Sequence, residues 1–254
     1  MKRPMGRPQE ATWRAVEPIG MESVWGSAAA RRLSERPPLA DDIHDVLVDM
    51  LMNHTLAPGS PLNIDAVAKQ LGVSPTPVRE ALVRVEADGL VVKAPRRGYL
   101  VAPLISLDDL HSLIDFRLLI EPASAAAAAE RVSAEQAARL QELARSGGTD
   151  DSNDPAVTRR GMLYDASFHD AVAELSGNPW LRESLSRLRS HLHMYRLYHH
   201  AGQGAATNVE HEIIADAIAS KDSAAASAAM RNHLHTAMKR IDDVFASGRA
   251  GKRA

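Results

Sequence analysis

The sequence predicts a mostly α-helical protein built from two domains. Three observations support this fold class. Alanine and leucine, which are strong helix formers, are abundant, whereas aromatic residues make up only 4% of the chain. From Ala40 onward apolar residues recur mainly at helical spacing, and the two segments that resemble strands lie close together near residue 100. The length of 254 residues is long for one domain and comfortable for two.

Composition excludes several classes of protein. There is no cysteine, so disulfides, thiol catalysis and cysteine-bound zinc are excluded. No apolar run approaches the roughly 20 residues that span a bilayer, and the basic N-terminus is not followed by the apolar stretch of a secretory signal. We therefore predict a cytoplasmic protein without a membrane partner. The net charge of −2 excludes a uniformly basic nucleic-acid binder but allows a local basic patch.

Two segments are predicted to be tails. Residues 1–38 contain five prolines and scattered arginines without a sustained period, which is typical of a mobile tail. Its basic residues could contact DNA phosphates, although a solvated extension explains them more simply. Residues 248–254 are the second predicted tail.

Residues 39–103 follow the order of a winged helix-turn-helix domain. A helix begins at Ala40 and is broken by LAPGSPLN, and a second helix in NIDAVAKQLGV is capped by Asn63 and closed by Gly72. A third helix starts in SPTP and is stopped by Gly89. LVVK and YLVA then read as two short strands around the tip APRRG.

The third helix has a face suited to DNA. Ser74 is placed to cap it, and its first turn tolerates the two prolines, which fix the direction of Arg79. Thr76, Arg79 and Arg84 should face outward. Arginine can grip guanine O6 and N7 in the major groove. The alternative, that Arg79 pairs with Glu80 or Glu86 on a solvated face, is less favoured because an arginine-tipped hairpin follows.

That hairpin tip would form the wing of the domain. Arg96 and Arg97 stand beside Gly98, a pattern suited to a phosphate or minor-groove contact. The tip and the third helix together predict a DNA-contact surface.

Residues 105–247 predict an all-helical antiparallel bundle. SLDD and SAEQ are capping boxes that open its first two helices, SGGTDDSND is a loop, and NPW begins a later helix with proline in the first turn. The alanine runs indicate close packing between helices. The later helices are expected over residues 155–176, 179–200, 207–220 and 222–246.

A metal site is predicted inside this bundle. Asp165 and His169 are four residues apart and share one helix face, and His211 and His233 each lie on the apolar stripe of a different helix. A single histidine of this kind is usually a satisfied core residue. Four such groups together would be costly to bury without a ligand, and one carboxylate with three imidazoles suits zinc, nickel or manganese. Open coordination positions could receive a small carboxylate.

The chain resembles the GntR family of bacterial transcription regulators. LGVSPTPVREALVRVEADGLV followed by PRRGYLVAP is similar to the family's DNA-binding domain, over about residues 40–103. The motifs DASFH, SGNP, EH, MRNH and RLLIEP resemble the helical ligand-sensing domain, called FCD, of its FadR-like branch. One departure is Pro75, which stands where the family usually has arginine.

This resemblance implies site residues and a function. The implied DNA contacts are Ser74, Thr76, Arg79, Arg84, Arg96, Arg97 and Gly98, and the implied metal ligands are Asp165, His169, His211 and His233. Zinc is the expected ion. Arg117 and Arg196 are candidates to hold an acidic effector, with ion pairs to neighbouring acids as the alternative. The implied function is a metabolite-responsive repressor that binds a palindromic DNA operator as a homodimer and a small organic acid beside the metal.

Two other functions remain open at this point. His169–Asp170 is an HD doublet of the kind found in metal-dependent phosphohydrolases, although an upstream histidine, a downstream aspartate and a general base are not evident. A structural DNA-binding protein without a ligand is the weaker alternative.

Overall fold

A computed structural model describes residues 40–95, 98–147, 155–190, 193, 196 and 204–246. The chain divides into two compact units, the first reaching Pro103 and the second beginning at Leu104, with residues 52–54 grouped with the second. Within the described part of the chain, no helix combines the length and the apolar character needed to cross a membrane.

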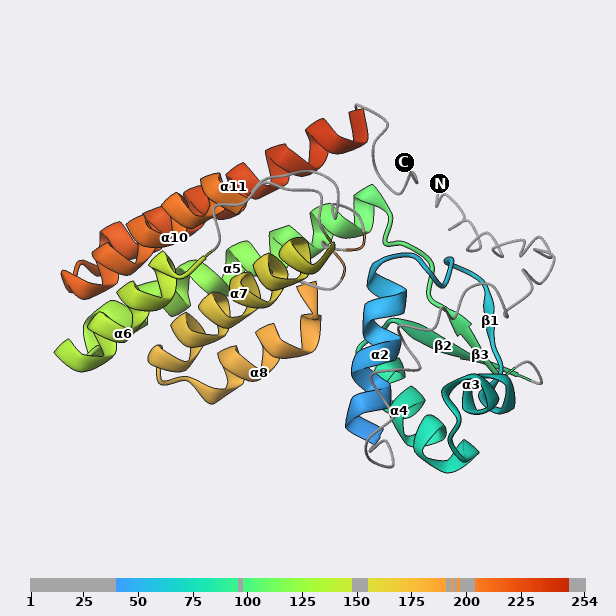
Figure 1. Cartoon of the computed structure of the whole chain (residues 1–254). Helices are drawn as coiled ribbons and strands as arrows, with labels where there is room; N and C mark the ends of the chain where they lie inside the picture. Colours follow the sequence, from blue (N-terminus) through green and yellow to red (C-terminus); the bar gives the residue numbers. More distant parts are fainter. Residues whose placement is uncertain are drawn as a thin grey trace, which may run out of the picture. The chain divides into compact units, whose positions relative to one another are not determined.

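The first unit contains three helices and a small sheet, shown in blue to green in Figure 1. Strand β3 lies in the middle of the sheet and pairs antiparallel with β1 and β2. The elements are α2 (Ala40–Met52), β1 (Pro61–Leu62), α3 (Ile64–Leu71), α4 (Pro75–Ala87), β2 (Val91–Ala94) and β3 (Gly98–Val101).

Local sequence explains where the helices of this unit begin and end. The Asn63 side chain accepts hydrogen bonds from two backbone N–H groups at the start of α3, and Gly72 closes that helix with a φ of 69°, in the left-handed region that favours glycine. Both features confirm the sequence prediction. Strand β1 was not predicted: the segment LAPGSPLN was expected only to break the helix, but its end pairs with Tyr99 and Leu100.

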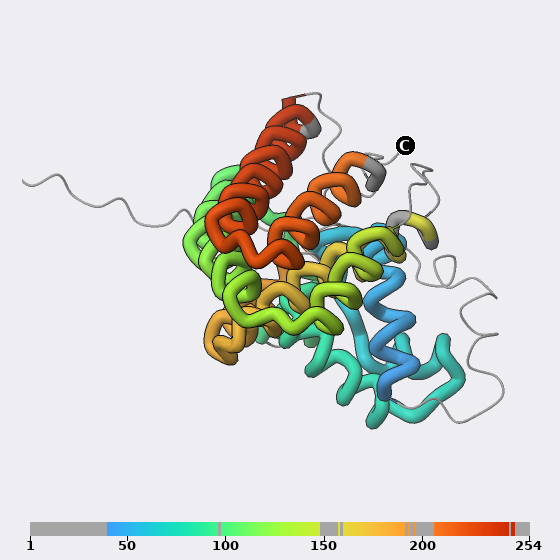
Figure 2. The backbone as a smooth tube through the Cα atoms, turned by 90° about the vertical axis from the view of Figure 1, so that its left-hand side faces the viewer, coloured from blue at the N-terminus to red at the C-terminus, as the bar shows by residue number. Residues whose placement is uncertain are grey.

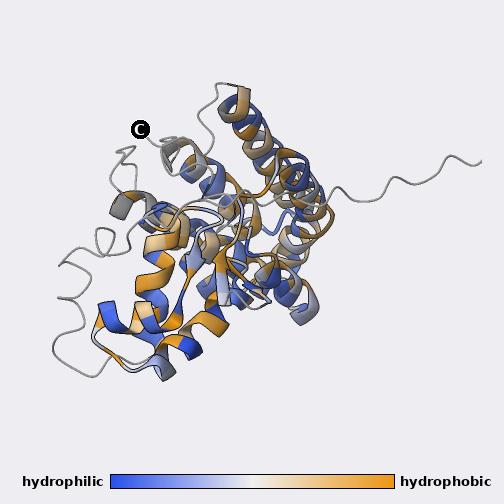
Figure 3. Ribbon diagram, turned by 90° about the vertical axis from the view of Figure 1, so that its right-hand side faces the viewer, coloured by the Kyte–Doolittle hydropathy of each residue, from blue (hydrophilic) through white to orange (hydrophobic). Residues whose placement is uncertain are grey.

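The core of the first unit forms where three amphipathic helices meet the sheet. In Figure 3 the helices carry both hydrophobic and hydrophilic stretches, as amphipathic helices do. One side of α4 packs into this core, and its opposite side is exposed. The buried apolar side chains include Ile43, Leu47, Leu51, Leu62, Val67, Val78, Ala81, Leu82, Val85, Leu90 and Val101.

The second unit is an all-helical bundle, as predicted. Helix α5 packs along α11, which in turn packs against α10, and the three lie next to one another in Figures 1 and 2. Ser106 caps α5, and Ser133 with Gln136 forms the full capping box that opens α6. The elements are α5 (Leu107–Arg131), α6 (Ala134–Arg145), α7 (Pro155–Leu175), α8 (Pro179–Leu188), α10 (Gly204–Ala219) and α11 (Ser223–Ala246).

Two helix boundaries differ clearly from the sequence prediction. α10 begins at Gly204, three residues before the predicted start at 207. The helix expected over 179–200 ends at Leu188, because Arg189 takes a left-handed conformation with φ of 48°. Apolar periodicity continues past this point and therefore does not reveal the break. Of the predicted loop SGGTDDSND, residues 148–154 lie outside the described residues, as do the predicted tails, 1–38 and 248–254.

The alanine run at 125–129 marks close helix packing, as expected, whereas most of the alanines at 224–229 are exposed. Ala125, Ala128, Ala129 and Ala226 are fully buried in the main core of the bundle. Their small side chains let neighbouring backbones approach closely, and larger residues from α7, α10 and α11 fill the remaining space. This packing positions the polar residues described next.

Candidate DNA-contact surface and metal centre

Helix α4 begins with exposed groups that its own fold does not use. Ser74 occupies the N-cap position, but its side chain makes no capping hydrogen bond, so the expectation that it caps the helix is wrong. Pro75 and Pro77 lie in the first turn, where a missing N–H costs no helical hydrogen bond. Ser74, Pro75 and Thr76 are all exposed.

Arg79 projects from the exposed side of α4. Within the described residues it makes no hydrogen bond or ion pair, and neither Glu80 nor Glu86 forms a salt bridge with it. Glu86 instead interacts with the Tyr99 hydroxyl. Burial and then this carboxylate raise the pKa of Tyr99, and the charge of Arg79 opposes them. The guanidinium of Arg79 therefore remains available for an external acceptor.

Arg84 has a partner inside the protein. Its Nη1 pairs with Asp41 of α2, but both side chains are more than half exposed. Exposed pairs of this kind contribute only about 0–1 kcal/mol, so a DNA phosphate could compete for the arginine.

The predicted wing is described only in part. Gly98 opens β3 opposite Ala94 and has a φ of 77°, a conformation that a residue with a Cβ adopts at a cost. Arg96 and Arg97, the predicted tip contacts, lie outside the described residues.

In the second unit the four predicted metal ligands come together. Asp165 and His169 project from α7, His211 from α10 and His233 from α11. One ligand atom of each lies within 4.8 Å of the others. His169 Nε2 is 3.2 Å from His233 Nε2, and Asp165 Oδ1 is 3.5 Å from His211 Nε2 and 3.7 Å from His169 Nε2.

The other ring nitrogen of each histidine, Nδ1, contacts a second residue. Glu121 Oε2 lies 2.5 Å from Nδ1 of His169, and Glu210 Oε2 lies 2.7 Å from Nδ1 of His233. The contact of His233 is a hydrogen bond, and since a carboxylate accepts, Nδ1 carries the proton in that ring. The contact of His169 is a close ion-pair distance without hydrogen-bond geometry.

Tyr164 fixes the third ring in the same way. Its hydroxyl donates to the Ala144 carbonyl at 2.7 Å, so its oxygen accepts from Nδ1 of His211 at 3.2 Å. With Nδ1 protonated in the rings of His211 and His233, Nε2 of both presents a lone pair toward the shared centre. Outer partners of this kind orient metal-binding histidines in proteins.

The pKa values of His211 and His233 are lowered, which favours the neutral imidazole that binds metal. Burial, and then the neighbouring His169 and His233, lower the pKa of His211 far below its ordinary value. Burial also lowers the pKa of His233, against the opposing effect of Glu210. His211 is fully buried, and its Nε2 has no hydrogen-bond partner among the described residues. An orphaned polar atom of this kind costs about 1–3 kcal/mol, and a metal ion would satisfy it.

Glu210 is itself held in place by an arginine. Arg240 donates to its two oxygens at 2.7 and 3.0 Å. Burial alone would raise the pKa of Glu210, but His233 and Arg240 lower it to about 2. Glu210 is therefore a charged group that orients His233 at the centre.

Arg117 reaches the same centre from α5. It is buried and paired with Glu121, as one of the two sequence hypotheses expected, and its Nη2 also lies 3.2 Å from His169 Nε2. Burial would raise the pKa of Glu121, but Arg117 and His169 hold it far below its ordinary value. Arg196 is buried too, and burial lowers its pKa to about 10.

Sequence reasoning missed the residues that orient the ligands. Glu121 lay inside the quoted motif RLLIEP, and Glu210 directly precedes His211, but neither was assigned to the centre. Arg240 follows His233 by two helical turns on the same side of α11. Tyr164 had no sequence signal beyond standing next to Asp165.

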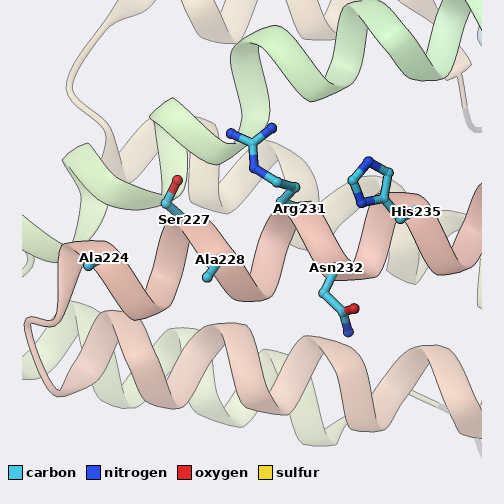
Figure 4. Close-up of a pocket in the computed structure, with 6 residues that line it drawn as sticks. All are labelled: Ala224, Ser227, Ala228, Arg231, Asn232 and His235. Carbon is cyan, nitrogen blue, oxygen red and sulfur yellow. The ribbon is translucent and has the colours of Figure 1, made fainter.

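A surface groove on α11 is distinct from this centre. Figure 4 shows its residues on one helix, and most of them are exposed, whereas His233 faces the opposite, buried side. A groove lined by a single helix does not enclose a small molecule. Its lining residues are Ala224, Ser227, Ala228, Arg231, Asn232 and His235.

Comparison with known families matches both units. Residues 39–101 match the model described as bacterial regulatory proteins, gntR family, and residues 112–236 match the FCD domain. An HTH-type transcriptional regulator in an unstable DNA locus of Streptomyces ambofaciens is 30% identical over 211 residues, covering 81% of this chain and 86% of the relative. The HTH-type transcriptional repressor RspR of Escherichia coli is 24% identical, covering 80% of this chain and 89% of the relative.

A solved structure supports the fold. McbR/YncC of E. coli matches with a TM-score of 0.63 and 22% identity, covering 82% of this chain and 99% of that one.

The winged helix-turn-helix unit and the helical unit thus define a DNA-binding transcription regulator and not an enzyme, so the phosphohydrolase hypothesis is wrong. The chain belongs to the GntR family and carries an FCD domain, a type of domain known to bind metal.

Proposed function

We propose that the protein is a metabolite-responsive repressor that acts in the cytoplasm. As a homodimer it would bind a palindromic operator, and it would bind a small organic acid beside a divalent metal in the helical unit. The observation that carries this proposal is the convergence of three histidine nitrogens and one carboxylate, while the other nitrogen of each imidazole contacts a second residue.

The donor set fits a transition metal. Imidazole and carboxylate ligands suit zinc, with nickel and manganese as alternatives. We assign Asp165, His169, His211 and His233 as the ligands. When bound, the ion would supply a Lewis-acidic position for an oxygen of the effector. The chain's own residues would fix the tautomers and exclude other orientations of the rings.

The charges around the centre favour an anionic effector. Asp165, Glu121 and Glu210 carry three negative charges, and Arg117 and Arg240 carry two positive ones. With neutral histidines this balance leaves one negative charge, which a divalent ion turns into one positive charge. A single carboxylate would then neutralise the site, and unpaired buried charge is costly.

Arginine would give the effector its orientation. Arg117 already contacts His169 Nε2, so it stands where an acid bound at the metal could also reach a guanidinium. Arg196 is proposed as the second effector contact because it is buried in the same unit.

On the DNA side, α4 would lie in the major groove and the wing would contact the backbone or the minor groove. Two copies would place two α4 helices on the half-sites of a palindrome. The relative RspR is named as a repressor, which supports repression as the proposed direction of regulation. The proposed contacts are Ser74, Thr76, Arg79, Arg84, Arg96, Arg97 and Gly98.

The test is a thermal-shift screen of chelator-treated protein. Zinc, nickel or manganese is added back with and without small mono- and dicarboxylates. A ligand at 100 times its Kd adds about 2.7 kcal/mol to the free energy of unfolding, so metal, and then one acid on top of metal, should each raise the melting temperature. An effective acid should also weaken operator binding, since coupling between the two sites is reciprocal.

A matched pair of variants on α11 provides the control. His233→Ala removes a ligand and should abolish the metal-dependent shift. His235→Ala, an exposed histidine two residues further along the same helix, should keep it. A metal shift that no acid increases would contradict the effector proposal, and a shift that survives His233→Ala would contradict the ligand assignment.

A further inference from the structure

The exposed side of α4 carries apolar groups that the core does not need. Val83 is 54% exposed, whereas Val78, Leu82 and Val85 of the same helix are fully buried. Pro75, in the first turn, is exposed as well. A single exposed valine would need no explanation, so the position of these residues decides whether they matter.

Pro75, Arg79 and Val83 follow one another at intervals of four residues. Residues spaced in this way lie on the same side of an α-helix. The structure therefore presents a stripe in which Arg79, which makes no hydrogen bond or ion pair within the described residues, stands between two apolar side chains. At a rise of about 1.5 Å per residue the members of the stripe are about 6 Å apart, which is close to two base-pair steps of about 3.4 Å.

The major groove offers one apolar group that matches such side chains. The C5-methyl of thymine is read by apolar contact, while Arg79 can bond guanine O6 and N7. We infer that the stripe reads a guanine flanked by thymines, with Val83 and Pro75 each packing against a thymine methyl within about two base pairs of the base bound by Arg79. This inference rests on the proposed function, in which α4 enters the major groove.

The inference gives Val83 a role in sequence specificity, through affinity for thymine at one position of each half-site. Phosphate contacts position a protein on DNA without carrying sequence information, and a valine cannot make them. Loss of Val83 should therefore relax sequence preference at one position of each half-site while leaving the salt dependence of binding unchanged.

The experiment removes one methyl group from the DNA. Operator sequences are first selected from a pool of random double-stranded DNA with the full-length protein. Each thymine of the half-site is then replaced by deoxyuridine, which lacks only the C5-methyl, and Kd is measured by fluorescence anisotropy at fixed salt. Burial of one methyl group corresponds to about a fourfold change per half-site, so substitution in both half-sites should weaken wild-type binding by more than tenfold.

Variants then assign the effect to a side chain. Val83→Ala should bind the thymine and deoxyuridine operators equally at the position that Val83 reads, whereas Val83→Thr, which retains a methyl group, should keep part of the preference. Alanine is a stronger helix former than valine, so folding of this variant is not at risk. Val92→Ala changes the exposed valine of β2 and should leave the deoxyuridine effect intact.

These outcomes distinguish a failure of this inference from a failure of the proposed function on which it rests. Selection of no sequence would overturn the proposed function itself. A selected operator with no deoxyuridine effect, or one whose effect persists in Val83→Ala, would overturn the reading by Val83 alone. A Val83→Ala variant that alters oligomeric state without altering base preference would also overturn it and would assign the exposed valine to a protein contact.

Discussion

Helix α4 and the histidine centre show opposite ways to build a binding site. On α4 the side chains proposed for function are exposed, and Arg79 has no partner among the described residues. At the centre every histidine is buried and held by a second residue. Water satisfies exposed groups until DNA replaces it, whereas buried polar groups must be oriented by the protein itself. The residues of an exposed site can therefore be recognised mostly from the sequence, whereas a buried site also depends on the residues that pack around it.

The sharpest test of this contrast is to disable each site alone. Arg79→Ala should weaken binding to the selected operator by about 1–3 kcal/mol and leave the metal-dependent thermal shift intact. His233→Ala should remove that shift, worth about 2.7 kcal/mol at 100 times Kd. Anisotropy and thermal denaturation measure the two effects on the same samples.

Arg139→Ala provides the control, because this exposed arginine of α6 pairs only with Glu135 among the described residues. It should change neither property. Equal loss of affinity for random DNA in Arg79→Ala would mean that Arg79 contacts phosphate and does not read a base.

A second prediction concerns how tightly the surroundings of the centre are packed. A Cβ at Gly147 would lie 2.2 Å from Asn208 Oδ1 and 2.6 Å from Tyr164 Cζ, whereas at Gly161 of α7 it would meet nothing within 4 Å. Gly147→Ala should lower the free energy of unfolding by about 1–3 kcal/mol. Gly161→Ala should raise it by about 0.5–1 kcal/mol, because alanine favours the helix.

Urea denaturation measures both variants. Because Tyr164 orients His211, Gly147→Ala should also weaken metal binding, measured by titration of the chelator-treated protein. If Gly147→Ala were as stable as the wild type, the region around the centre would be looser than the distances indicate.

The smallest expected effect concerns a histidine of the first unit. His44 Nε2 lies 2.9 Å from Asp88 Oδ2, and this hydrogen bond raises the pKa of His44 above 6.5, against burial and with a smaller contribution from Asp45. A raised pKa stabilises the fold fully below the unfolded pKa, and this contribution is lost as pH rises through the folded pKa.

Hydrogen–deuterium exchange of peptides from α2 and α4 in the full chain, corrected for intrinsic rates, measures this dependence. Protection should fall between pH 6 and 8 in the wild type and should be flatter in His44→Gln. His235→Gln, on the surface of α11, should behave as the wild type; an unchanged slope in His44→Gln would assign the pH dependence to other groups.

Sequence predicted the architecture well wherever local chemistry determines it. Asn63, Gly72 and the Ser133 capping box define helix ends through contacts with their own neighbours. Strand β1 escaped prediction because two residues pair with a distant strand and have no period of their own. The break at Arg189 escaped because a left-handed arginine has no sequence signature.

The residues of the candidate metal centre likewise divide into those that spacing along a helix predicts and those that it does not. Helical spacing placed Asp165, His169, His211 and His233 on inward faces, and the structure brings them together. The residues that orient these ligands were not predictable. Glu121, Tyr164 and Glu210 each contact a histidine on another helix, and spacing along one helix does not reveal contacts between helices.

The origin of the four ligands on three different helices has a consequence for unfolding. A metal ion bound there would act as a removable cross-link between α7, α10 and α11, and closing loops between distant residues restricts the unfolded chain. The helical unit could then not separate these helices before it releases the ion. Its lifetime against proteases would follow the supply of free metal, so metal-starved cells would hold less of the regulator even without any change in its synthesis.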